Sequence, residues 1–269
     1  MVVFPNCKIN LGLHITGKRA DGYHELETIF YPVQLKDVLE TVSTDGEMVF
    51  TTSGMDIPGN TDNNLCIKAY QLLKKDFPRL PAIRMHLHKI IPMGAGLGGG
   101  SADGAFALTL LNDQFNLNLS TDQLIQYAAM LGSDCPFFII NQPCFAEGRG
   151  EILSPVSLNL SGYQFVLVHP GIHISTKWAF EQLTPAKSPV PLTHIIAQPI
   201  ESWKDLLYND FEAPIARMHP QISSIKNALY EDGAVYASMS GSGSTIFGIY
   251  PNNQPVTVQS NLLHPVQIV

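Results

Sequence analysis

A run of glycines between a predicted strand and a predicted helix is the part of this sequence best suited to chemistry. Residues 94–100 contain five glycines in seven positions, and Ser101 follows them. Glycine has no Cβ, so successive backbone N–H groups can turn toward one ligand and approach a phosphate closely. The helix that follows directs the positive end of its dipole at the same point. The pattern predicts a phosphate-binding loop, in which Ser101 caps the helix, contacts a phosphate or helps to hold Mg²⁺.

Other kinds of glycine-rich segment have to be weighed against this one. A flexible surface turn seldom sits at a strand-to-helix junction. The spacing Gly94-x-Gly96-x-x-Gly99 matches the dinucleotide fingerprint, but here the loop follows several predicted strands and a helix rather than the first strand. Gly100 stands where a Walker A loop has lysine. The His-Arg-Asp and Asp-Phe-Gly sequences of protein kinases are absent. We therefore expect a nucleotide loop of another class.

Phosphoryl transfer also needs charge neutralisation and an acceptor for the hydroxyl proton. Asp134 lies between Gly132 and Pro136, a setting that predicts a tight, partly buried turn and a candidate base. Lys8 and Asn10 share one face of a predicted strand, because strand side chains alternate. On residue chemistry alone, a turn-capping aspartate and a solvated strand lysine remain the commoner interpretations.

A second loop rich in glycine and serine, residues 240–244, lies near the C-terminal end and contains Gly241 and Gly243. It too can bring backbone close to phosphate. A plain hairpin turn between two predicted strands is the alternative.

Three segments together resemble one kinase superfamily, that of galactokinase, homoserine kinase, mevalonate kinase and phosphomevalonate kinase. They are residues 5–13, Pro-Asn-Cys-Lys-Ile-Asn-Leu-Gly-Leu; residues 92–101, Pro-Met-Gly-Ala-Gly-Leu-Gly-Gly-Gly-Ser; and residues 238–245, Ser-Met-Ser-Gly-Ser-Gly-Ser-Thr. They occur in the expected order over more than half of the chain, which leaves little room for chance.

Three further segments are similar to a narrower family, the 4-diphosphocytidyl-methylerythritol kinases. They are residues 18–26, Lys-Arg-Ala-Asp-Gly-Tyr-His-Glu-Leu; residues 131–138, Leu-Gly-Ser-Asp-Cys-Pro-Phe-Phe; and residues 146–151, Ala-Glu-Gly-Arg-Gly-Glu. The likeness is strong through about residue 175 and is weaker after it, apart from the second loop. It implies an α+β fold of two lobes, with mixed sheets and helices, and with ATP and substrate in the cleft between the lobes.

The resemblance also implies roles for single residues. The catalytic pair would be Asp134, accepting the substrate proton, and Lys8, which keeps the carboxylate ionised. Substrate contacts would come from Asn10, Tyr23, His24 and Thr176, with Tyr23 and His24 at a cytosine. The implied nucleotide contacts, with Mg²⁺ ligands left unassigned, are Asn64, Lys89, Pro92, Met93, Gly94, Ala95, Gly96, Leu97, Gly98, Gly99, Gly100, Ser101, Ala102, Gly241 and Gly243.

Several of these residues have ordinary structural alternatives. Tyr23 can cover the edge of a core beside an exposed His24. Asn64 can begin a helix, and Lys89 can be a solvated strand lysine. Thr176 follows Ser175 where the family more usually has proline before threonine, which leaves the C-terminal substrate contacts open.

Two other functions stay open beside phosphorylation of the 2-hydroxyl of 4-diphosphocytidyl-2-C-methyl-D-erythritol in non-mevalonate isoprenoid synthesis. One is a kinase of the same superfamily for another small alcohol, such as homoserine or mevalonate. The pair Tyr23-His24 argues against it, because those alcohols carry no base. The other is a non-catalytic binding protein on the same fold, against which the intact Lys8, Asp134 and both loops argue.

The secondary-structure elements that must position these residues are predicted to be strands and helices in mixed order. This order favours an α+β fold. Strands are expected at 7–16, 24–35, 38–43, 48–52, 83–87, 165–168, 235–239 and 245–250. Helices are expected at 63–77, 101–115, from a capping box at 120–123, and at 203–208, 211–218 and 222–230. The stretch 184–199, rich in Pro, Ser and Thr, is expected to be a loop.

Composition bounds the remaining possibilities. The chain has 269 residues, 45% hydrophobic and 14% charged, with a net charge of −7. This suits two lobes, taken as an N-terminal ATP-binding domain at 1–157 and a C-terminal domain at 158–269. The acidic balance disfavours nucleic acid and membrane surfaces. Four dispersed cysteines, no signal-like start and no long apolar run indicate a cytoplasmic protein.

Overall fold

The computed structural model describes residues 1–258 and 264–269, and the chain divides into two compact units. Unit 1 comprises Met1–Cys7, Gln34–Met93 and Gly98–Gln142. Unit 2 comprises Lys8–Val33, Gly94–Leu97 and Pro143–Val269. The units interleave along the chain, and the glycine loop contributes residues to both. The domain boundary expected between residues 157 and 158 stays a prediction.

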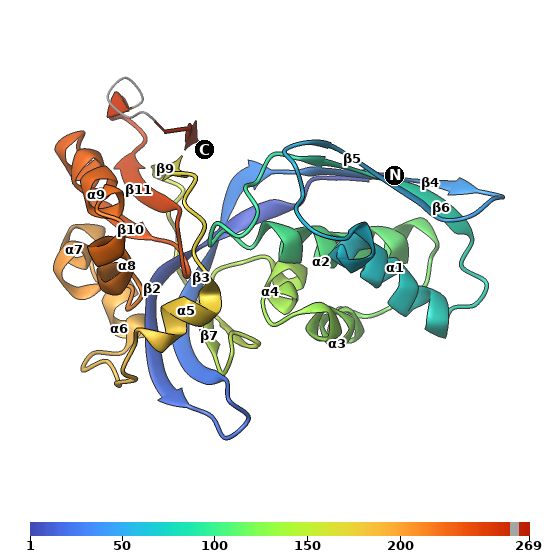
Figure 1. Ribbon diagram of the computed structural model, residues 1–269, viewed down its shortest axis with the longest axis horizontal. Helices are drawn as coiled ribbons and strands as arrows, with labels where there is room; N and C mark the ends of the chain where they lie inside the picture. Colours follow the sequence, from blue (N-terminus) through green and yellow to red (C-terminus); the bar gives the residue numbers. More distant parts are fainter. Residues whose placement is uncertain (259–263) are drawn as a thin grey trace. The chain divides into compact units, whose positions relative to one another are not determined.

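Unit 1 is a sheet with helices on one side of it (Figure 1). The strand order is β1-β4-β6-β5, in which β5 runs parallel to β6 and the other pairs are antiparallel. The strands are β1 (Val2–Val3), β4 (Val38–Thr44), β5 (Val49–Gly54) and β6 (Ala82–Lys89). The helical segments are the 3₁₀ turn η1 (Thr61–Asn63), α1 (Leu65–Asp76), α2 (Gly99–Gln114), α3 (Thr121–Leu131) and α4 (Cys135–Ile140).

Alternation along β6 decides which face of this sheet is covered. Ile83, Met85 and Leu87 are buried, whereas Arg84 and His88 are exposed. Period-two burial of this kind is what the sequence predicted for this strand. Helix α2 packs against β1 and β4 of this sheet, and α1 packs against α2. Removing each such leucine or isoleucine from water contributes about 1.5–3 kcal/mol to folding.

Unit 2 contains two sheets, with strand orders β2-β3-β7-β8 and β10-β11-β9-β12. The strands are β2 (Asn6–Lys18), β3 (His24–Lys36), β7 (Cys144–Glu147), β8 (Ile152–Pro155), β9 (Tyr163–Val168), β10 (Tyr236–Met239), β11 (Ile246–Pro251) and β12 (Val266–Ile268). The helical segments are α5 (Thr176–Glu181), α6 (Leu192–Ile196), the 3₁₀ turn η2 (Ile200–Ser202), α7 (Trp203–Leu206), α8 (Glu212–Met218) and α9 (Gln221–Glu231).

One apolar core joins the two sheets of unit 2 to its helices. It contains Ile15 from β2, Val168 from β9 and Ile246 from β11, packed with Ile215 of α8 and Leu229 of α9. Burial therefore holds β2, which carries Lys8 and Asn10, against the sheet that carries the second loop.

The predicted elements are confirmed in large part, with two corrections in the C-terminal half. The stretch expected to be a loop at 184–199 contains helix α6, which begins directly after Pro191. Proline there has the backbone angle of a helix start and no N–H that the helix would need. The helix expected at 203–208 is shorter, since α7 ends at Leu206. The capping box at Ser120 and Gln123 is present.

Candidate active site

In unit 2, strand β2 holds Lys8 and Asn10 in a buried polar network. The Lys8 Nζ donates to the Asn10 Oδ1 at 2.9 Å and lies 4.2 Å from the centre of the Phe30 ring. The Asn10 Nδ2 donates to the Thr28 Oγ1 at 3.0 Å. Lys8 is 4% exposed, so a solvated strand lysine is ruled out. Because a charged group this well buried needs partners, the network fixes the direction of the ammonium.

The second loop joins β10 to β11 and packs against the same network. The Ser240 Oγ accepts from the Asn10 N–H at 3.2 Å and donates to the Gly96 carbonyl at 2.7 Å. The Asn209 Nδ2 also binds this segment, donating to the carbonyls of Met239 and Gly241 at 2.8 Å each. The segment is thus a hairpin connection, as one interpretation had it, and is also joined to the first glycine loop.

Residues 94–97 of the first glycine loop are fixed within unit 2 by backbone contacts. The Lys8 N–H donates to the Leu97 carbonyl at 3.0 Å, and the Thr245 N–H donates to the Ala95 carbonyl at 3.2 Å. Gly96 has a φ of +80°, and a Cβ there would overlap the Ser240 carbonyl oxygen. The three segments that carry the superfamily resemblance therefore meet in unit 2.

The rest of the first loop belongs to unit 1 and begins helix α2. Gly98 occupies the N-cap position with a φ of +69° and offers no capping side chain. The first N–H groups of a helix lack intrahelical partners, so this end remains suited to an anion. Ser101 lies in the first turn rather than at the cap. Burial raises the pKa of the nearby Cys135 thiol to about 12, and Ser101 acts against this shift.

Lys89 lies at the end of β6, directly before the loop, and its side chain is fully buried. It forms ion pairs with Asp37 and with Asp103, the latter at 2.7 Å. Burial raises the pKa of Asp103 to about 7, and the neighbouring Asp37 adds to this while Lys89 opposes it. Burial works to lower the pKa of Lys89, but the charges of Asp103 and Asp37 outweigh it and raise that pKa.

This arrangement predicts a particular dependence of stability on pH. The pKa of Asp103 is higher in the folded chain than in the unfolded chain. Its stabilising contribution to the free energy of unfolding is therefore fully present below about pH 4 and is lost as the pH rises through about 7. Asp37, Lys89 and the thiol of Cys66 are the titratable groups that act on it. Between pH 5 and 8, urea unfolding should show a larger fall in stability for the unaltered chain than for Asp103→Asn. Equal falls would contradict the assignment.

Asp134 precedes helix α4 in unit 1 and is half-buried. It occupies the N-cap position, but its side chain makes no capping hydrogen bond. The side chain therefore does not cap helix α4. Asn64, in contrast, does cap a helix: its Oδ1 accepts from the Cys66 N–H at 2.9 Å at the start of α1. A nucleotide contact for Asn64 stays a prediction.

The predicted cytosine residues lie in unit 2, where β3 begins. Tyr23 is 57% exposed, and the Arg149 guanidinium carbon lies 5.0 Å from its ring centre. His24 stacks on Phe180 of α5, with ring centres 4.7 Å apart and an angle of 16° between the rings. Thr176 begins the same helix, and its hydroxyl lies 3.3 Å from that of Ser242 in the second loop.

Sequence reasoning missed the residues that hold these side chains in place. Thr28, Asn209 and Ser240 support the network in unit 2, and Asp37 and Asp103 hold Lys89. Of these, only Ser240 lay inside a segment singled out from the sequence.

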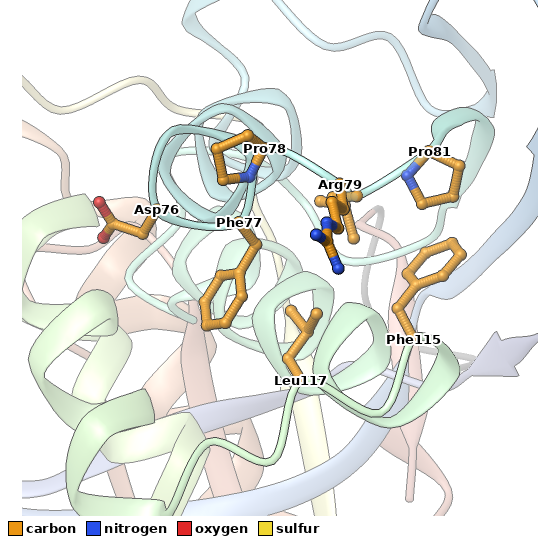
Figure 2. Close-up of a pocket in the computed structure, with 8 residues that line it drawn as sticks. Asp76, Phe77, Pro78, Arg79, Pro81, Phe115 and Leu117 are labelled. Atoms are coloured by element: carbon orange, nitrogen blue, oxygen red, sulfur yellow. The ribbon is translucent and has the colours of Figure 1, made fainter.

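A pocket of about 490 Å³ in unit 1 has none of these residues in its lining. Figure 2 shows the side chains that line it, among them Phe77, Arg79, Phe115 and Leu117. Phe115 follows the last residue of α2, so the length of that helix, about 24 Å, separates the pocket from the glycine loop. We do not include it in the candidate site.

Comparison with known proteins decides the family. The model of the GHMP kinase N-terminal domain matches residues 64–145, and that of the GHMP kinase C-terminal domain matches residues 193–264. A Bacteroides fragilis protein named 4-diphosphocytidyl-2-C-methyl-D-erythritol kinase is 52% identical over 260 residues, covering 96% of this chain and 94% of its own. The chain belongs to the 4-diphosphocytidyl-2-C-methyl-D-erythritol kinase family. It is an ATP-dependent phosphotransferase, as the members of this GHMP kinase family are.

Three further comparisons support the family and the fold. A Cytophaga hutchinsonii protein of the same name is 48% identical, covering 97% of this chain and 96% of its own. A crystal structure of 4-(cytidine 5′-diphospho)-2C-methyl-D-erythritol kinase matches with a TM-score of 0.80 at 30% identity, covering 93% of this chain and 90% of that one. The Methanococcus jannaschii mevalonate kinase structure matches with a TM-score of 0.74 at 13% identity, covering 100% of this chain and 96% of that one, which shows the shared fold.

The expected GHMP-kinase fold, with mixed sheets and helices, is thereby confirmed. Among the helices of residues 1–258 and 264–269, none is long and apolar enough to cross a membrane.

Proposed function

We propose that this kinase transfers the γ-phosphoryl group of MgATP to the 2-hydroxyl of 4-diphosphocytidyl-2-C-methyl-D-erythritol, a step of non-mevalonate isoprenoid synthesis. The observation that carries the proposal is the likeness to relatives of this name over nearly the whole chain. The exposed Tyr23 and the stacked His24 supply the surface that a cytosine base would need.

The proposed chemistry gives each of these groups a task that its surroundings suit. Asp134 accepts the proton of the attacking hydroxyl, the role that the resemblance to the family implies for it. Lys8, held by Asn10, stabilises the negative charge that develops on the attacking oxygen. The N–H groups of both glycine loops receive the phosphates, and most of the catalysis is positioning of charged groups.

Mg²⁺ enters this proposal as part of the nucleotide substrate. In the described part of the chain, no group of three or more His, Cys, Asp or Glu side chains could hold a metal ion. In kinases, Mg²⁺ is usually bound by one or two carboxylates together with substrate phosphates and water. The hydroxyl of Ser101, in the first turn of α2, is the candidate protein ligand at the loop.

Release of ADP with a panel of acceptors tests the function. The protein is assayed with MgATP and, in turn, the cytidine-linked methylerythritol, homoserine and mevalonate. We expect turnover with the first alone. Turnover with another member would keep the kinase chemistry and overturn the cytosine assignment. No turnover in folded, ATP-binding protein would favour a binding protein on this fold.

Replacing Tyr23 with alanine should weaken binding of the acceptor and not of ATP. Stacking of one base on an aromatic ring is worth about 1–3 kcal/mol, so the KM for the cytidine-linked alcohol should rise by roughly 5- to 150-fold. Tyr23→Phe, which keeps the ring, is the matched control and should stay near the original KM. Equal KM values for all three proteins would refute a stacking role for Tyr23.

A further inference from the structure

The carboxylate of Asp37 binds the residues that directly precede the glycine loop. Asp37 lies between β3 and β4, and its side chain is fully buried. Its Oδ1 accepts from the N–H groups of Ile90 and Ile91, at 2.6 and 2.8 Å, and its Oδ2 accepts from the Lys89 ammonium. Three successive residues before the loop are therefore bound to a single carboxylate.

Lys89 connects these residues to the helix that follows the loop. Its ammonium also donates to the Oδ2 of Asp103 at 2.7 Å, and Asp103 is the fifth residue of helix α2. The two ends of the loop, Ile91 and Gly99, are so close that a Cβ on Gly99 would lie 2.8 Å from the Ile91 Cγ2 and 3.0 Å from the Lys89 Nζ. One ammonium thus joins the strand before the loop to the helix after it.

The charges of this cluster do not balance, which makes it a poor device for stability alone. Two carboxylates and one ammonium are buried together, and the Asp103 Oδ1 is buried without a hydrogen-bond partner among the described residues. Removing ions from water costs several kcal/mol for each, and well-packed apolar side chains often stabilise such a site better. A cluster of this kind is suited instead to fixing the position of the segments that it joins.

We propose that Asp37, Lys89 and Asp103 are positioning residues for the nucleotide, which clamp the two ends of the glycine loop so that its N–H groups are preorganised for phosphate. The inference rests on the proposed role of that loop in binding ATP. It requires no contact between Lys89 and the nucleotide. Such a role fits the general observation that a site is only as accurate as the groups that support it.

Calorimetric binding of MgADP to the full chain tests this proposal. Asp103→Asn keeps the shape of the side chain and removes the second ionic partner of Lys89. The dissociation constant for MgADP should rise about tenfold, as small displacements of positioning groups commonly cost 10- to 100-fold. Thermal stability should not fall, because the change removes an imperfectly paired buried charge. The KM for the acceptor alcohol should stay unchanged.

Two further variants keep the result interpretable. Asp37→Asn removes the charge at the other end of the loop and should weaken MgADP binding in the same way. Asp113→Asn removes an exposed carboxylate from the opposite end of α2 and should bind MgADP like the unaltered chain.

Two results would overturn the proposed positioning role of these residues. One is an unchanged dissociation constant for MgADP in both Asp103→Asn and Asp37→Asn. The other is a loss of affinity that merely follows a loss of folded protein. If the unaltered chain binds no MgADP, the proposed function fails and the inference with it, a result distinct from either of these.

Discussion

Asp134→Asn is expected to abolish turnover and to leave binding of MgADP intact. Asparagine has nearly the shape of aspartate but cannot accept the proton of the attacking hydroxyl, and loss of a general base typically costs 10²- to 10⁴-fold in rate. We therefore expect kcat to fall by at least about 100-fold. Steady-state kinetics at saturating substrates gives kcat, and calorimetry with MgADP gives the affinity.

Asp122→Asn is the matched control for this variant. Asp122 lies exposed in the first turn of the neighbouring helix α3, so its loss removes the same charge without touching the proposed site. Its kcat should be unchanged. If Asp134→Asn lost nucleotide affinity and turnover together, Asp134 would be a structural residue of the nucleotide site and not the base.

Gly96→Ala is expected to damage both the fold of unit 2 and the nucleotide site. A Cβ at this position would overlap the backbone carbonyl oxygen of Ser240, which cannot rotate away. The φ of +80° adds strain of about 1–2 kcal/mol for any residue with a Cβ. Overlap in a packed interior commonly costs a further 1–3 kcal/mol. Urea unfolding measures the stability, and calorimetry with MgADP measures the affinity.

Gly94→Ala distinguishes backbone strain from the overlap of a new Cβ with the Ser240 carbonyl oxygen. Gly94 also has a positive φ, of +64°, but a Cβ there meets nothing within 4 Å. Its stability should fall by the strain alone, and Gly96→Ala should fall further by about 1–3 kcal/mol. If the two variants were equally destabilised, the close approach of the two loops would not hold this part of the chain together.

Local patterns in the sequence predicted the elements that carry the site. Alternation at Ile83, Met85 and Leu87 gave strand β6, and the glycines after it gave the loop and the start of α2. Short elements were harder to predict. Helix α4, Cys135–Ile140, is a single apolar run of six residues, which periodicity cannot assign to helix or strand.

The supporting residues could not be predicted, because their roles depend on distant contacts. Asp37 and Asp103 stand 52 and 14 positions from Lys89. Nothing next to either aspartate in the sequence indicates that it is buried. The same holds for Asn209, which reaches Gly241 of the second loop from 32 positions away. Sequence chemistry found the groups proposed to touch substrates and missed those that hold them.

³¹P NMR of the product shows whether a phosphoryl group has been transferred to the proposed hydroxyl of the cytidine-linked alcohol. The name 2-C-methyl places a methyl group on carbon 2, so that carbon carries no hydrogen. A phosphate on its oxygen should therefore give one new monoester resonance without coupling to a carbinol proton, beside an intact diphosphate and an equivalent of ADP. A monoester signal split by carbinol protons would place the phosphate on another hydroxyl. Inorganic phosphate without any monoester would contradict phosphoryl transfer to the alcohol.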